Sequence, residues 1–294
     1  MIDAVTPRCY LAREDKFMVL DNVSDEGFTV CDKHKFLDYD RVLVVLQSLA
    51  KLHASSIIYE EKRSSELGEH YRLTDDHEEE FEESFFNDRP DFVNAKGVEA
   101  SVKGVVKEID IFGFPHKLPS GKSFPEMAEK VCYKVYDLVK PSKRFRNVLC
   151  HGDLWATNFL LKYNINAQPT SGGCKFVDFQ CGRYAPPAQD VLSVLYLTTG
   201  RGFRGEVHVP GDRDFMESCE EQKLFAIVQA AIYFPLILVG NDLVEAYFSD
   251  AELNEKALFE DRSYLVLAHM NKDESYTTRL KESIQDLKEY CDYL

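Results

Sequence analysis

Three side chains near the middle of the sequence have the types and the order that phosphoryl transfer requires. Asp153 and Asn158 stand five residues apart in one turn, and Asp178 follows a later apolar stretch. In this chemistry one carboxylate accepts the proton of the attacking hydroxyl. An amide oxygen and a second carboxylate hold the magnesium that bridges the nucleotide phosphates. The alternative without a function is a polar turn in which Asp178 is an ordinary turn carboxylate. The presence of all three residues in this order favours the catalytic interpretation.

The residues beside Asp153 support this interpretation. Gly152 permits a tight turn after a short apolar stretch, so the Asp153 carboxylate is expected to point outward. His151 is interpreted as a hydrogen-bonding residue that fixes the loop rather than as a base. A metal-dependent hydrolase could use the same pair of aspartates, but nothing in the sequence resembles the ligands of a second metal.

Short strands must position these side chains, and helices must pack around them. Strands are predicted at residues 8–13, 16–21, 147–150, 158–162 and 174–179. Helices are predicted over residues 39–60 with Asp38 as the cap, from Ser123 to about Lys140, and over 188–199, 214–249, 251–269 and 273–292, with breaks at Pro235, Ser249 and Asn271. This order of elements indicates an α+β fold with a mostly helical second half.

Four stretches resemble the ecdysteroid kinase-like family, also called CHK kinase-like proteins. They are His151-Gly152-Asp153-Leu154-Trp155-x-x-Asn158, Val177-Asp178-Phe179-Gln180, Arg183-Tyr184-x-Pro186-Pro187-Ala188-x-Asp190 and Leu49-Ala50-x-Leu52-His53-Ala54-x-Ser56. The resemblance extends from about residue 8 over nearly the whole chain. It implies a protein-kinase-like fold of the aminoglycoside phosphotransferase type, related also to choline kinases.

The resemblance also implies roles for the motif residues. Asp153 is expected to be the catalytic base, with Asn158 and Asp178 as the magnesium ligands. Asp190, together with His151, is expected to brace the catalytic loop through hydrogen bonds, a role compatible with a plain helix cap.

Two further expectations concern residues outside the motifs around Asp153. Asp21, Asn22 and Val23 would lie in the hinge whose backbone reads the adenine of ATP. His53 is interpreted as a core or loop-bracing histidine rather than a catalytic one.

The start of the sequence departs from the family pattern. A kinase-like N-lobe has a phosphate-covering loop and a strand lysine, and Met1 comes only about seven residues before the strand pair leading to the hinge. We therefore expect residues 1–24 to be the end of a truncated N-lobe plus the hinge, and residues 25–294 to be the C-lobe. Lys16 is a poor candidate for the phosphate lysine. The motif at residues 200–205, Gly-x-Gly-x-x-Gly, follows a predicted helix instead of a strand, which argues against a nucleotide-binding motif. Its arginines leave a substrate or phosphate contact as an alternative, but we expect a mobile loop because such connections are generally exposed and mobile.

Composition excludes some classes of partner. The chain has 294 residues and a formal charge of −15, which argues against nucleic acid and anionic membranes as main partners. The longest apolar candidate for a membrane span, residues 224–239, is too short and contains Gln229 and Pro235. The eight cysteines fit no zinc pattern and suggest reduced thiols in a cytoplasmic protein.

Two functional hypotheses follow. The first is an ATP- and magnesium-dependent kinase that phosphorylates a hydroxyl on a small molecule, an ecdysteroid-like steroid alcohol by family analogy. The second is a catalytically impaired pseudokinase, or a truncated gene product, that binds a small molecule without the phosphate loop and lysine. The sequence identifies neither the acceptor nor the oligomeric state.

Overall fold

The fold is described from a computed structural model, over residues 4–13, 16–89, 91–207, 211–240, 244–245 and 249–294. By packing density the chain divides into two compact units. The first comprises Met1–Glu82, Pro141–Thr199 and Gly211–Cys219, and the second comprises Glu83–Lys140, Gly200–Pro210 and Glu220–Leu294. This division does not test the boundary between N-lobe and C-lobe expected at residue 24, which stays a prediction.

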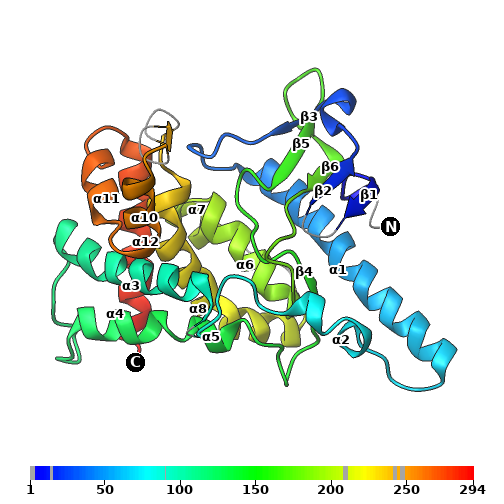
Figure 1. The fold of residues 1–294 in the computed structure, drawn as a ribbon, viewed down its shortest axis with the longest axis horizontal. Helices are drawn as coiled ribbons and strands as arrows, with labels where there is room; N and C mark the ends of the chain where they lie inside the picture. Colours follow the sequence, from blue (N-terminus) through cyan, green and yellow to red (C-terminus); the bar gives the residue numbers. More distant parts are fainter. Residues whose placement is uncertain (1–3, 14–15, 90, 208–210, 241–243, 246–248) are drawn as a thin grey trace. The chain divides into compact units, whose positions relative to one another are not determined.

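Within the described residues, the strands all belong to the first unit (Figure 1). They form a hairpin of β1 (Cys9–Arg13) and β2 (Phe17–Leu20), a sheet in the order β3 (Phe28–Val30), β5 (Phe159–Tyr163), β6 (Pro169–Phe176), and a pair of β4 (Val148–Cys150) and β7 (Arg183–Ala185). All pairings are antiparallel. The strands predicted from alternation and turn residues are therefore confirmed, although β6 begins earlier and ends at Phe176.

Helix α1 (Tyr39–Leu67) is the central helix of this unit and packs on β4, β6 and α6 (Pro187–Thr198). The predicted cap is confirmed, because the Asp38 side chain accepts a hydrogen bond from the amide of Arg41 at 3.0 Å. The helix runs seven residues beyond the predicted end, to Gly68 in the left-handed conformation at φ 74°. Two short elements follow, α2 (Leu73–Asp76) and the 3-10 turn Glu79–Phe81.

By length and composition alone, α1 is also able to cross a membrane. A buried core helix passes the same test, and 44% of the apolar window is buried inside the structure. The buried face of α1 includes polar side chains, which is typical of a helix packed against protein.

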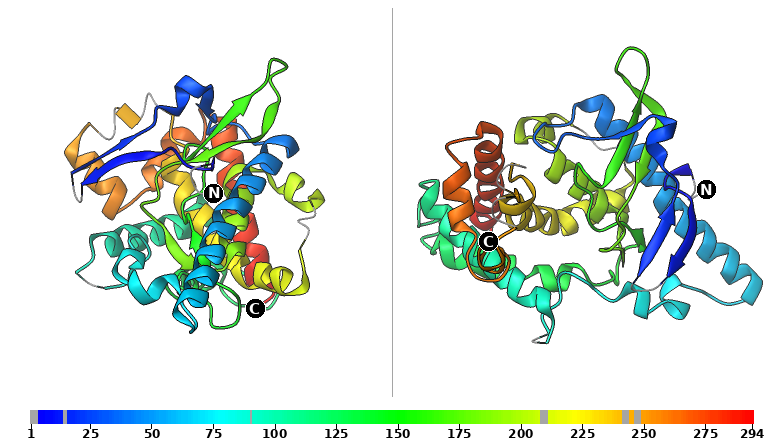
Figure 2. Two further views of the ribbon diagram at one scale, coloured as in Figure 1. Left: turned by 90° about the vertical axis from the view of Figure 1, so that its right-hand side faces the viewer. Right: turned by 45° about the horizontal axis from the view of Figure 1, so that its top comes forward.

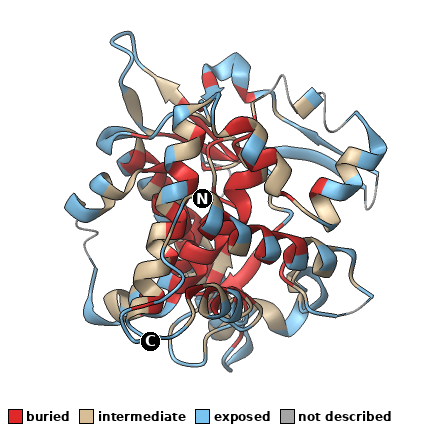
Figure 3. Cartoon of the chain, turned by 90° about the vertical axis from the view of Figure 1, so that its left-hand side faces the viewer, coloured by how far each residue is buried: buried red, intermediate tan, exposed pale blue. Residues whose placement is uncertain are grey.

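The second unit is helical. Its elements are α3 (Val93–Ile111), α4 (Phe124–Cys132), α5 (Val135–Leu138), α7 (Arg201–Glu206), most of α8 (Arg213–Ile237), α10 (Ala251–Phe259), α11 (Ser263–His269) and α12 (Glu274–Asp292). Helix α3 packs on α4, α10, α11 and α12. Figure 2 gives two further views of these helices, and Figure 3 shows that buried residues concentrate on helices and strands.

Several predicted helix boundaries are wrong. Ser123 does cap α4, but that helix ends at Cys132 rather than near Lys140. Helix α8 continues past Pro235 to Ile237 and does not extend to residue 249. The predicted loop at residues 200–205 is the short helix α7, because Arg201 and Arg204 both pair with Asp286 of α12.

Candidate active site

The strand pairings bring the motif residues together. The chain leaves β4 at Cys150, forms a loop over residues 151–158, and enters β5 at Phe159, which pairs with Phe176 at the end of β6. The Val177 amide then donates to the Asn158 carbonyl at 3.0 Å. Asn158 and the Val177-Asp178 segment therefore lie side by side, although 20 residues separate Asn158 from Asp178 in the sequence.

Asp153 is a buried carboxylate with one oxygen held and one oxygen free. Its exposed fraction is 7%. Oδ2 accepts a hydrogen bond from Asn158 Nδ2 at 2.9 Å, whereas Oδ1 is buried and has no hydrogen-bond partner among the described residues. Burial and the nearby Asp178 charge raise the pKa of Asp153 to about 6, against the lowering effect of the Asn158 hydrogen bond. A carboxylate with such a pKa is suited to accept a proton near neutral pH.

Asn158 and Asp178 offer oxygens next to Asp153. The Asn158 amide nitrogen is committed to Asp153, because it donates to the Asp153 carbonyl at 2.8 Å as well as to the carboxylate. The amide oxygen is left with one long contact, from Thr157 Oγ1 at 3.4 Å. Asp178 is exposed and has φ 65°, a left-handed conformation that is strained for a residue other than glycine. Amide and carboxylate oxygens are the donors that Mg²⁺ prefers, so these residues fit a magnesium ion.

His151 connects the loop to the Asp178 segment. Its Nε2 donates to the Val177 carbonyl at 2.8 Å, and its Nδ1 accepts from the Asp153 amide at 3.3 Å. The imidazole also lies against Phe179, with ring centroids 4.5 Å apart. Burial lowers the pKa of His151, which favours the neutral ring. Because both ring nitrogens are hydrogen-bonded, His151 holds the loop at Asp153 and the strand end at Val177 together.

Asp190, near the start of α6, holds the first residues of the same loop. Its carboxylate accepts from the amides of His151 at 2.7 Å and Gly152 at 2.9 Å. His53 Nε2 of α1 contacts the same carboxylate at 2.9 Å. Burial would raise the pKa of Asp190, but the hydrogen bond with His53, together with the contacts to His151 and Gly152, outweighs this effect and lowers the pKa below its usual value. The charged form of Asp190 is therefore favoured, and its two oxygens accept the hydrogen bonds of the loop amides.

Gly152 allows the loop to pass close to the segment after Asp178. Its φ is 80°, and a Cβ at this position would stand 2.0 Å from the carbonyl oxygen of Cys181. No side chain fits there unless the Cys181 backbone moves. The close approach explains why glycine precedes the Asp153 carboxylate.

His53, Cys150 and Asp190 also form a buried group whose possible ligand atoms lie within 4.8 Å of one another. These atoms already have protein partners, because Cys150 Sγ donates to the Ala185 carbonyl at 3.3 Å and Asp190 is bonded to His53 and to the loop amides. The group is therefore explained as a bracing network.

The predicted hinge residues lie after β2. Asp21 accepts from the Tyr10 hydroxyl at 2.6 Å, and Asn22 accepts from the Ser24 amide at the start of the 3-10 turn Val23–Glu26. Val23 is buried in a cluster with Phe28 and Leu160, against which Val177 packs. The hinge segment thus contributes to the apolar cluster that supports the residue before Asp178. Its role in reading adenine stays a prediction.

The contacts of two residues in this region were not predicted from the sequence, although Ser56 stands in one of the motifs. Ser56 accepts from the Leu149 amide of β4 at 3.1 Å, and Glu60 is buried and bonded to β7. The signal that could have found them is their spacing from His53, three and seven residues on, which places polar side chains on one face of an apolar helix.

Comparisons with known proteins identify a family and two solved structures that are similar to this chain. The sequence model of the ecdysteroid kinase-like family matches residues 3–207, and no curated protein matches the chain. A choline/ethanolamine kinase family protein from Mesorhizobium loti is 14% identical, with TM-score 0.38, over 98% of this chain and 80% of that one. Plasmodium vivax ethanolamine kinase is 11% identical, with TM-score 0.41, over 98% of this chain and 69% of that one. At TM-scores this low, the two structures carry no argument about this chain.

Proposed function

Because the chain belongs to the ecdysteroid kinase-like family, we propose that Asp153, Asn158 and Asp178 form the centre of an ATP- and magnesium-dependent phosphotransferase. Family membership confirms the predicted α+β protein-kinase-like fold and assigns the chain to a lineage of small-molecule kinases. The proposed reaction transfers the γ-phosphoryl group of ATP to a hydroxyl on a small molecule.

One observation carries the proposal. The free Oδ1 of Asp153 is the acceptor that the attacking hydroxyl needs, and it is buried beside two potential magnesium ligands. An unpartnered buried carboxylate oxygen costs stability, and at Asp153 it lies beside two potential magnesium ligands. This combination supports a role as proton acceptor.

Each residue has a definite part in this mechanism. Asn158 Nδ2 holds Asp153 Oδ2, which leaves Oδ1 to receive the proton of the acceptor hydroxyl. The oxygens of Asn158 and Asp178 would hold magnesium, which neutralises phosphate charge when bound. His151 and Asp190 keep the loop in the geometry that the reaction requires. Asp21, Asn22 and Val23 would contact the adenine.

The family suggests the class of acceptor and the place of action. We propose a lipophilic alcohol of the ecdysteroid type as the acceptor. All eight cysteines are free thiols, which supports the proposal of a cytoplasmic protein. A catalytically impaired binding protein is the rival that an assay must separate from the enzyme.

The test is Mg-ATP turnover by the purified chain, with and without an ecdysteroid alcohol, for wild type and Asp153→Ala. We expect steroid-dependent ADP release in the wild type and a loss of roughly 100-fold or more in the variant, because general-base catalysis contributes about that much. Trp155, the single tryptophan of the chain, reports Mg-ATP binding through its fluorescence in the same samples.

Two results would contradict the enzyme. Equal rates for wild type and Asp153→Ala would exclude catalysis by this site. Binding of Mg-ATP or the steroid without turnover would support the impaired binding protein instead.

A further inference from the structure

Helix α1 carries a row of buried polar side chains that contact the residues supporting the catalytic loop. His53, Ser56 and Glu60 are separated by three and four residues, so they lie on one face of the helix. His53 holds Asp190, and Ser56 accepts from the Leu149 amide of β4. The third residue of the row, Glu60, has no part in the mechanism proposed above.

Glu60 is almost completely buried, with an exposed fraction of 1%, and three donors surround its carboxylate. Oε1 accepts from the Tyr184 hydroxyl at 2.7 Å and from the Leu73 amide at 2.9 Å. Oε2 accepts from Arg146 Nη2 at 2.8 Å. Both carboxylate oxygens are thus directed at fixed partners on three separate segments.

The residues that Ser56 and Glu60 contact lie opposite each other in the β4–β7 pair. Leu149 of β4 and Tyr184 of β7 are direct cross-strand partners. Ser56 holds the first, and Glu60 holds the second. Asp153 follows Leu149 by four residues, and Asp178 precedes Tyr184 by six. Helix α1 is therefore bonded to both strands next to the site: β4, which Asp153 follows in the sequence, and β7, which Asp178 precedes.

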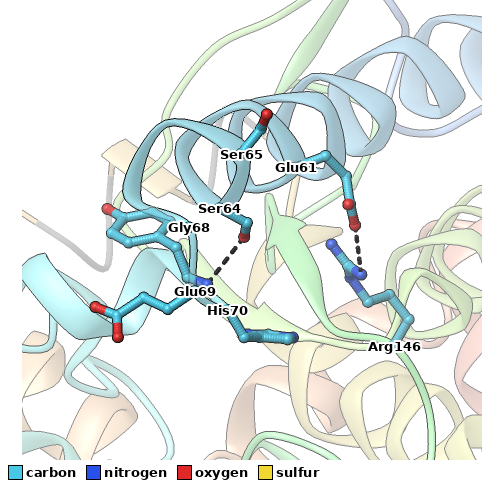
Figure 4. Close-up of a pocket in the computed structure, with 8 residues that line it drawn as sticks. Glu61, Ser64, Ser65, Gly68, Glu69, His70 and Arg146 are labelled. Atoms are coloured by element: carbon cyan, nitrogen blue, oxygen red, sulfur yellow. Dashed lines mark hydrogen bonds and ion pairs between the residues drawn. The ribbon is translucent and has the colours of Figure 1, made fainter.

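Stability alone is a poor reason to bury a carboxylate here. Replacing a buried ion pair by apolar side chains of similar volume is often neutral or stabilising. A carboxylate supplies directional contacts that an apolar side chain lacks. Figure 4 shows the outer side of the network, where Arg146 extends toward Glu61 beside the end of α1.

We propose that Glu60 is a positioning residue for the catalytic loop, acting through the Tyr184 hydroxyl and the β4–β7 pair. This inference rests on the proposed phosphotransferase function for its effect on rate. Its effect on the order of the loop is independent of that function, because Trp155 lies inside the loop and reports its order directly.

The test compares Glu60→Gln and Tyr184→Phe with Glu61→Gln. Glu61 contacts the same Arg146 at 3.2 Å, but its side chain is 68% exposed and, within the described part of the chain, it has no hydrogen bond to β4 or β7, so it is the matched control. The measurements are acrylamide quenching of Trp155 fluorescence well below the unfolding temperature, and kcat and KM for Mg-ATP turnover.

For Glu60→Gln and Tyr184→Phe we expect stronger quenching and a kcat lowered roughly 10-fold at unchanged KM, because small misplacement of reacting groups is costly. Glu61→Gln should match the wild type. The positioning role is overturned if both variants match the wild type in quenching and kcat. If Glu60→Gln fails to fold, Tyr184→Phe decides, since it keeps the ring and loses only the hydroxyl. Absent turnover in the wild type would refute the phosphotransferase, while the quenching comparison would still decide the positioning role.

Discussion

Asp153 illustrates how a single residue is kept reactive at the expense of stability. Its carboxylate is buried, one oxygen has no partner, and its pKa is raised to about 6. The folded state therefore holds a proton at pH values where the unfolded chain has released it. Stability falls as pH rises from the unfolded value of 3.8 to about 6 and stays reduced above that.

Substituting Asp153 by asparagine should therefore stabilise the protein while abolishing turnover. The rise in pKa to about 6 corresponds to at most about 3 kcal/mol, so we expect a gain of about 1–3 kcal/mol at pH 8. The gain should disappear below about pH 4, where the carboxyl is protonated in both states. Urea unfolding at several pH values measures it.

The control for this substitution is Asp137→Asn, because the Asp137 side chain is 82% exposed. It should change stability by less than about 0.5 kcal/mol at any pH. A loss of stability in Asp153→Asn at pH 8 would show that the carboxylate is structurally required.

The same aspartate sets an expectation for the rate. If Asp153 is the base, kcat/KM should rise with pH through an apparent pKa near 6, since only the charged form accepts a proton. Burial lowers the pKa of His151, which favours its neutral form over the pH range in which Asp153 becomes charged.

At the scale of elements, the sequence predicted what depends on neighbouring residues. The caps at Asp38 and Ser123 were predictable because a capping side chain bonds to an amide two or three positions away. The order of Asp153, Asn158 and Asp178 was readable for the same reason, since the loop itself carries the motif.

Features that depend on distant partners were not predictable. Helix α8 continues two residues past Pro235, and side chains about 30 to 40 positions away bond to carbonyls near this proline: the Tyr276 hydroxyl to Pro235, and Arg262 to Ile232. Helix α7 forms where a loop was expected, because acidic residues of α12 hold its two arginines. The left-handed φ of Asp178 has no local sequence signature either.

Like Asp153, Glu108 of helix α3 is a buried carboxyl with unpartnered oxygen in the described part of the chain, and it lies in the helical unit. Its exposed fraction is 0%, and neither oxygen has a hydrogen-bond partner among the described residues. Burial raises its pKa well above the usual value, although nearby Arg262 opposes this. Arg262 uses its guanidinium on the carbonyls of Ala257, Ile232 and Gly97.

Replacing the ionisable Glu108 by a neutral side chain should stabilise the helical unit at high pH, because burial disfavours the charged carboxylate in the folded state. We expect Glu108→Gln to raise the free energy of unfolding by about 1–3 kcal/mol at pH 8, because an uncompensated buried group costs about that much. The difference should vanish near pH 4, where the wild-type carboxyl is protonated in both states. Glu99→Gln on the exposed face of α3 is the control. A pH-independent difference would contradict the account.

At the scale of the whole molecule, the thiols are the sharpest check on the described packing. Cys9 is exposed, Cys219 is half-buried, and the other six of the eight cysteines are buried and free. Burial raises the pKa of Cys31 and Cys291 to about 11, which keeps them as unreactive thiols at neutral pH. A thiol reagent should therefore distinguish the cysteines by exposure.

With Ellman's reagent at pH 8 we expect one fast thiol from Cys9 and a second, slower one from Cys219. The remaining six should react only after unfolding in guanidinium, because the thiolate is the reacting form and burial limits both its formation and its access. Cys9→Ser should remove the fast phase alone. Three or more fast thiols in the native protein would contradict the described burial of the cysteines, which include Cys150 and Cys181 next to the catalytic loop. Fewer than eight thiols after unfolding without reductant would instead reveal disulfides and argue against the proposed cytoplasmic location.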